Sequence, residues 1–87
     1  TQVVADHYHI LLKDLLGDKK TRSVTRPRQI AIYLINEKTE ETLVNIGQYF
    51  NNRDHATVIH SIKTINEQLK VDKELKKIVE EIRKKLN

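Results

Sequence analysis

The residues of this chain best suited to chemistry stand together in the segment RDHAT, residues 53–57. Asp54 is a good N-cap residue, so we expect a helix to begin beside it. The first turn of a helix presents unpaired N–H groups and a partial positive charge, and it therefore attracts phosphate oxygens. The other residues of the segment would surround that point: Arg53, His55, Ala56 and Thr57. A simpler interpretation stays open at this stage, in which Asp54 only caps a hydrated helix.

The helix that follows this segment has two different faces. Its apolar residues fall at i, i+4, i+7 and i+11, which is one stripe of a helical period: Val58, Ile62, Ile65 and Leu69. The opposite stripe carries small side chains, hydroxyls and imidazole, with a lysine at its edge: Ala56, Thr57, His60, Thr64 and Lys63. The first stripe predicts contact with a core. The second predicts close approach to a polar partner.

A basic segment, residues 19–28, contains five basic residues and no acidic one. We expect an extended arm that leads into a helix, because Pro27 suits a first-turn position. Two pairs of side chains would then contact nucleic acid, one pair in a groove and the other at phosphates: Lys20 with Arg22, and Arg28 with Gln29. Such a run often serves solubility alone, but its position beside a helix start favours nucleic-acid contact.

Composition limits the classes of protein to consider. The chain has 87 residues, of which 32% are charged, with a net charge of +4 and a pI of about 9.4, and this balance suits nucleic acid or an anionic membrane. The absence of Cys excludes thiol catalysis and cysteine metal sites and favours a reducing cytoplasm. No apolar run approaches the roughly 20 residues of a membrane span, and no signal peptide is visible. Because the chain begins at Thr1, we expect a single domain, residues 1–87, cut from a longer protein.

Helices are predicted throughout, because two Gly and one Pro leave little scope for hairpins. The expected helices are residues 1 to about 9, 11–16, 27 to about 38, 43–50, 54–69 and a last helix after Asp72. We expect Gly17 to end the second helix in the left-handed conformation, residues 39–42 to cap the fourth helix, and Gly47 to let another helix pass close by. The last helix places five apolar residues on one stripe: Leu75, Ile78, Val79, Ile82 and Leu86.

A short helix, a tight polar connection and a longer helix with a bare polar face form the pattern of a helix-turn-helix, whose second helix sits in a major groove. The third predicted helix is apolar on a broad arc, which is typical of a central helix. The predicted fold class is therefore all-α, a compact bundle of about six helices with a helix-turn-helix core.

Two segments carry a family resemblance. RPRQIA, residues 26–31, and IGQYFNNRDHATVIHS, residues 46–61, at this separation, resemble the C-terminal DNA-binding domain of the bacterial replication initiator family DnaA. The resemblance covers nearly the whole chain and rests most specifically on RDH-x-T-V-x-H. It implies a Trp-repressor-like helix-turn-helix domain that binds double-stranded replication-origin boxes of the TTATCCACA type in the bacterial nucleoid.

The resemblance also implies roles for single residues. In the major groove, base edges would be met by Asp54, His55 and Ala56. Phosphates would lie near Arg53, Thr57, His60 and Lys63. Lys20 would enter the minor groove, the DNA backbone would be held by Arg28 and Gln29, and Leu43 and Val44 would approach DNA from the first helix of the motif. The chain departs from the family pattern where Ala56 replaces Thr, Lys20 replaces Arg, and Asn51 and Asn52 replace Gly-Gly.

Two other function classes remain as alternatives, a helix-turn-helix transcriptional regulator and a basic protein-interaction module whose last helix and arm dock an acidic partner. Catalysis is not expected, because His55 and His60 have no acidic partner at a suitable spacing and no Gly-rich phosphate loop exists. His7 and His9 are poor metal partners, because two residues apart they point to different sides of a helix. By resemblance, ATP hydrolysis, with its ATP or ADP and Mg, belongs to a separate domain, so no cofactor is expected here. The isolated domain is expected to be a cytoplasmic monomer without a membrane partner, and the full-length protein to oligomerise on the origin.

Overall fold

The computed structural model describes residues 1–86, and within them every regular element is an α-helix. The six helices are α1 (Gln2–Tyr8), α2 (Leu12–Leu16), α3 (Arg22–Lys38), α4 (Leu43–Tyr49), α5 (His55–Gln68) and α6 (Lys73–Leu86). The all-α class and the order of helices expected from the sequence are confirmed.

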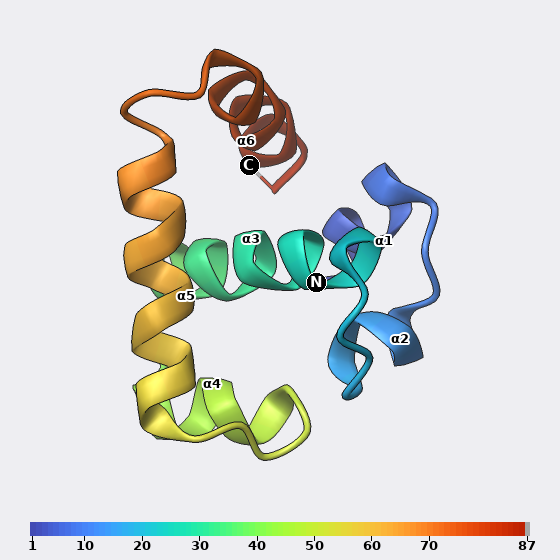
Figure 1. Cartoon of the computed structure of the whole chain (residues 1–87), viewed down its shortest axis with the longest axis vertical. Coiled ribbons are helices and arrows are strands. Elements are labelled where there is room, and N and C mark those ends of the chain that lie inside the picture. Colours follow the sequence, from blue (N-terminus) through green and yellow to red (C-terminus); the bar gives the residue numbers. More distant parts are fainter. Residues whose placement is uncertain (87) are drawn as a thin grey trace.

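Helix α3 lies at the centre of the fold. It packs against α1, α2, α4 and α5, most extensively against α5, which stands across one end of it in Figure 1. Ile30, Ala31, Ile32 and Leu34 of α3 are all buried, as a helix covered on several sides requires. The broad apolar arc of the sequence therefore predicted the central helix correctly.

The start of α3 differs from the expectation. The helix begins at Arg22, with extended backbone at Thr21, and Pro27 lies inside it. Pro27 has no N–H to donate to the carbonyl one turn earlier, so the helix forgoes one hydrogen bond there. The additional turn buries Val24, which is 5% exposed, together with Pro27 itself. The extended arm predicted over residues 19–28 is thus reduced to a short loop, residues 17–21, which we call the basic loop.

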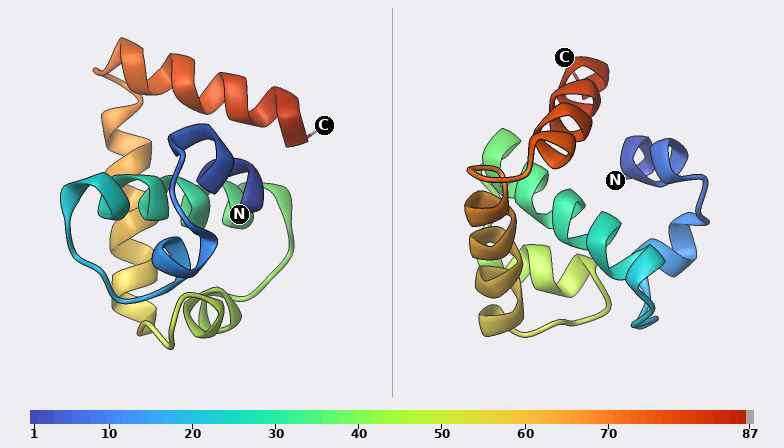
Figure 2. Two further views of the ribbon diagram at one scale, coloured as in Figure 1. Left: turned by 90° about the vertical axis from the view of Figure 1, so that its right-hand side faces the viewer. Right: turned by 45° about the horizontal axis from the view of Figure 1, so that its top comes forward.

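Helices α4 and α5 form the helix-turn-helix (Figures 1 and 2). The Thr42 side chain caps α4 by accepting a 3.1 Å hydrogen bond from the Asn45 amide, as expected for the 39–42 segment. Asn51 and Asn52 in the turn have φ values of 63° and 56°, a conformation that Asn tolerates better than most residues. Gly47 permits a close approach, as expected: a Cβ there would stand 3.3 Å from the Val58 side chain of α5, and closer still, 2.2 Å, to the Arg53 carbonyl oxygen in the turn.

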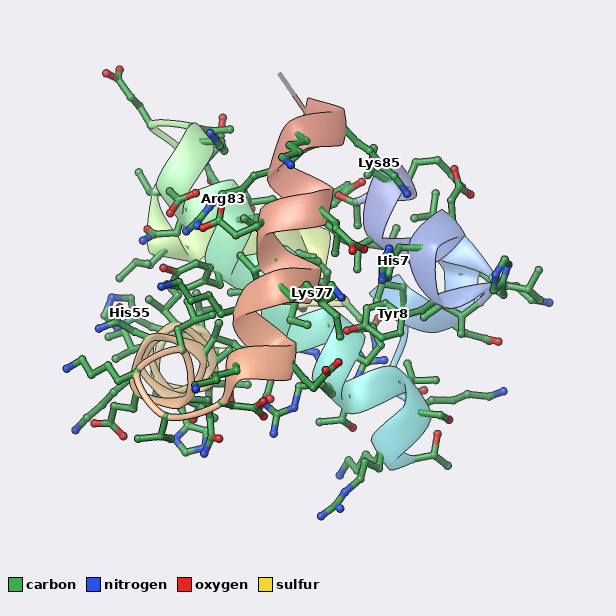
Figure 3. The ribbon with its side chains drawn as sticks, turned by 90° about the horizontal axis from the view of Figure 1, so that it is seen from above. His7, Tyr8, His55, Lys77, Arg83 and Lys85 are labelled. Atoms are coloured by element: carbon green, nitrogen blue, oxygen red, sulfur yellow. The ribbon has the colours of Figure 1, made fainter. Side chains whose placement is uncertain are left out.

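Helix α6 closes the fold beside α1 (Figure 2). Leu75, Val79 and Ile82 are buried, while Leu86, expected on the same stripe, is 40% exposed because it lies at the last turn. Arg83 ties α6 to the end of α3 through two hydrogen bonds to the Glu37 carboxylate, of 2.9 and 2.5 Å (Figure 3).

Gly17 does not adopt the expected left-handed conformation. Its φ is −82° and its ψ −155°, which is extended backbone. Glycine is required there for space, because a Cβ would stand 2.9 Å from the Lys13 carbonyl oxygen.

Candidate nucleic-acid interface

The start of α5 is an exposed, capped helix terminus. The Asp54 carboxylate accepts a 2.8 Å hydrogen bond from the Thr57 amide, as the sequence predicted for an N-cap. Hydrogen bonding from the Thr57 side chain and amide holds the pKa of Asp54 below its usual value. His55 and Ala56 are exposed, and Figure 3, which looks along α5, shows His55 on the side of that helix away from α6 and α1.

The two faces of α5 are divided as the sequence predicted. Val58 and Ile65 are fully buried, and Ile62 and Leu69 pack against the core in half-buried positions. On the opposite face His60 and Lys63 are exposed, and Thr57 and Thr64 are half-buried. The polar face of α5 is therefore available to a partner along its length.

A cleft joins the basic loop to the polar face of α5. It has a volume of 320 Å³, and its walls include Lys20 from the loop, Gln29 from α3, and Thr57 and His60 from α5. Ser61 also lines it, and its hydroxyl donates a 3.1 Å hydrogen bond to the Thr57 carbonyl. No Asp or Glu is among the residues that line this cleft in the part of the chain that the structure describes. The fold thus brings together two segments that the sequence singled out separately.

A second, smaller pocket of 280 Å³ lies beside the cleft, at the start of α3. It is lined by Lys20, Arg22, Thr25, Arg26 and Gln29. Arg26 is not among the residues predicted from the sequence to contact DNA, because the predicted helix begins after it. Because α3 starts at Arg22, Arg22 and Arg26 stand at i and i+4 and share one face of the helix. This four-residue spacing is the sequence signal that could have identified Arg26 as part of the basic surface. Within residues 1–86, the Nη1 of Arg26 is buried and has no hydrogen-bond partner.

Arg28 requires a correction. Its side chain was expected to hold a DNA phosphate, but it is only 4% exposed. Its guanidinium donates three hydrogen bonds to backbone carbonyls, at 2.7 Å to Leu15, 2.7 Å to Lys19 and 2.8 Å to Asp14. Asp14 and Leu15 belong to α2 and Lys19 to the basic loop, so Arg28 is a buried residue that bonds both segments to α3.

The first helix of the motif presents apolar groups at its start. Val44 is 53% exposed and Leu43 is half-buried. Leu43 lines a groove with Ile59, Ile62 and Lys63 of α5. Leu43 and Lys63, both expected to lie near DNA, therefore border the same groove.

Two negative findings apply to residues 1–86. No three His, Cys, Asp or Glu side chains gather closely enough to hold a metal ion. None of the helices is long and apolar enough to cross a bilayer.

The family comparison agrees with the helix-turn-helix. Residues 1–65 match the family model described as the bacterial dnaA protein helix-turn-helix. The chain is 45% identical over 85 residues to the chromosomal replication initiator protein DnaA of Citrifermentans bemidjiense, covering 98% of this chain and 19% of that protein. It is also 45% identical over 85 residues, 98% of this chain and 18% of the relative, to the same initiator from a Geobacter species. With the initiator of Geotalea daltonii it shares 43% identity over 83 residues, 95% of this chain and 19% of the relative. The chain spans about a fifth of the length of these relatives. It belongs to the bacterial DnaA helix-turn-helix family.

Proposed function

We propose that this domain binds double-stranded DNA at replication-origin boxes of the TTATCCACA type, with the start of α5 in the major groove and the basic loop at the adjacent minor groove. One observation carries the proposal. Lys20 of the loop and Thr57 and His60 of α5 border one cleft, and none of the described residues that line it is acidic. A cleft lined by positive and hydroxyl-bearing groups attracts phosphate oxygens, and phosphate contacts fix the register in which bases are read.

The leading turn of α5 is proposed to read bases. Asp54 uses one carboxylate oxygen for the cap, which leaves the other to accept from an amino group of cytosine or adenine. His55 can hydrogen-bond a base edge, and the Ala56 methyl can contact a thymine methyl. These three exposed residues supply the sequence preference.

Residues around this turn are proposed to hold the DNA backbone: Gln29, Arg53, Thr57, His60 and Lys63. Lys20 is proposed to enter the minor groove, with Arg22 beside it, and Leu43 and Val44 approach DNA from α4. Arg28 is left out of this set because it is buried. The isolated domain acts as a monomer and not as an enzyme. Oligomerisation on the origin and ATP hydrolysis belong to the full-length initiator.

The proposal is tested by substituting each base pair of a box in turn and measuring the affinity of wild type and two variants. His55→Ala should lower box affinity by about 1–3 kcal/mol while affinity for random duplex changes little. Lys63→Ala should weaken binding to both duplexes and reduce the slope of log K against log salt by roughly 1. Lys76→Ala is the matched control, because it removes the same charge from an exposed position on α6.

Wild-type protein that binds box and random duplex equally well at all salt concentrations would overturn the proposal. A protein-interaction module would give that result.

A further inference from the structure

Two arginines far apart in the sequence, Arg28 and Arg53, donate hydrogen bonds to backbone carbonyls of the basic loop. Arg28 of α3 fixes the Lys19 carbonyl at 2.7 Å, directly before Lys20 in the chain. It also fixes the Asp14 and Leu15 carbonyls at the end of α2. The loop is thereby bonded to α3 on one side.

Arg53 ties the same loop to the helix-turn-helix. Its Nη2 donates a 2.8 Å hydrogen bond to the Gly17 carbonyl, 36 residues earlier in the chain. Its own backbone is held in turn, because the Arg53 amide donates to the Gly47 carbonyl at 2.8 Å. A continuous set of hydrogen bonds therefore connects α4, the start of α5 and the loop that carries Lys20.

Lys20 itself is exposed, and no ion pair or hydrogen bond of its side chain is found among residues 1–86. It lines the cleft that α5 borders. A flexible loop would have to be ordered when DNA binds, which weakens association, whereas a loop already held in place avoids that loss.

Resting on the proposed function, we propose that Arg28 and Arg53 are positioning residues, which hold the basic loop so that Lys20 stands at a fixed place relative to the start of α5. The greater part of their effect on DNA binding is exerted through Lys20, and the backbone contact proposed above for Arg53 accounts for the remainder. The two guanidinium groups thus fix the position of the proposed minor-groove residue, Lys20, relative to the proposed major-groove residues at the start of α5.

A double-mutant cycle tests this inference with Lys20→Ala, Arg53→Met and the double variant, using duplex that carries the box. Arg53→Met should weaken binding about tenfold in the wild-type background and by about twofold or less when Lys20 is already Ala, because coupled residues are not additive. Arg53→Lys keeps the charge but lacks the Nη2 donor, so it should show the same dependence on Lys20.

Lys63→Ala supplies the matched control cycle. Lys63 is exposed on α5 and lines the groove beside Leu43, a different one from the cleft that Lys20 lines. The loss of affinity in Lys63→Ala should therefore add to the loss in Arg53→Met. If the Lys20 cycle is as additive as the Lys63 cycle, Arg53 does not act through Lys20 and the inference is wrong.

A measurement on the free protein separates this inference from the proposed function. In Arg53→Met, NMR order parameters of the Lys19 and Lys20 amides should fall from about 0.85 to below about 0.6, with those of the helices unchanged. Unchanged loop order parameters would overturn the inference even if the domain binds its box. Wild-type protein that shows no preference for the box would overturn the proposed function. The order parameters would still show whether Arg53 holds the basic loop in place.

Discussion

The carbonyl oxygen of Arg53 lies over Gly47, so close that a Cβ added to Gly47 would stand 2.2 Å from it. Alanine favours a helix over glycine by about 1 kcal/mol, so propensity alone predicts that Gly47→Ala stabilises. The contact predicts the opposite, because the turn must move, and overpacking of this kind costs about 1–3 kcal/mol. Chemical denaturation should show a net loss of stability. Gln48→Ala, at an exposed position of the same helix, should change it little.

Arg28→Met should destabilise the domain. The substitution leaves the Asp14, Leu15 and Lys19 carbonyls without their donor. A buried acceptor without a partner lowers the free energy of unfolding by about 1–3 kcal/mol. We expect a loss of about 2–4 kcal/mol in the free energy of unfolding. Arg22→Met, which removes an exposed arginine, serves as the control. Equal, small effects of the two substitutions would show that the three bonds add nothing to stability.

Asp54 should give the domain an acid-sensitive component of stability. Its folded pKa lies below the value of 3.8 for an unperturbed carboxyl, so the ionised cap stabilises fully above that value. The contribution is lost as pH falls through the lower, folded pKa. Asp54→Asn keeps an N-cap acceptor that does not titrate. Thermal melts taken from about pH 6 down to about pH 2 should therefore fall less steeply for the variant than for wild type. Parallel curves would exclude this role.

Lys20→Arg should tighten binding to an A·T-containing box. A guanidinium group is less strongly hydrated than an ammonium group and has a forked set of N–H donors, so narrow minor grooves favour it. Fluorescence anisotropy should show a several-fold increase in affinity for the box, which corresponds to a binding free energy more favourable by on the order of 1 kcal/mol. Lys70→Arg makes the same change at an exposed position after α5 and should have no effect. A gain shared equally by both variants would indicate general charge chemistry instead of a minor-groove contact.

Local signals in the sequence predicted much of this fold. The Asp54 and Thr42 caps form their expected hydrogen bonds with residues three positions on. The spacing of Val58 and Ile65 predicted their burial. These features depend on residues within one or two turns of each other, so the sequence pattern contains the whole interaction.

Tertiary features could not be predicted in this way. Pro27 suited a helix start, but burial of Val24 extends α3 beyond it. Arg28 belonged to a run of cations that looked solvated, yet its acceptors lie 9 to 14 residues earlier. The Arg53 bond to Gly17 spans 36 residues. Each depends on helices meeting in three dimensions, which no local pattern records.

The charge on Asp54 has a consequence for how DNA is entered. An exposed carboxylate at the tip of α5 repels phosphate oxygens, although the bare end of a helix would welcome them. In the complex proposed above, the start of α5 would therefore be repelled by the DNA backbone and attracted only where an adenine or cytosine amino group donates a hydrogen bond to Asp54. In that complex the side chain that caps α5 would also select against binding to random DNA.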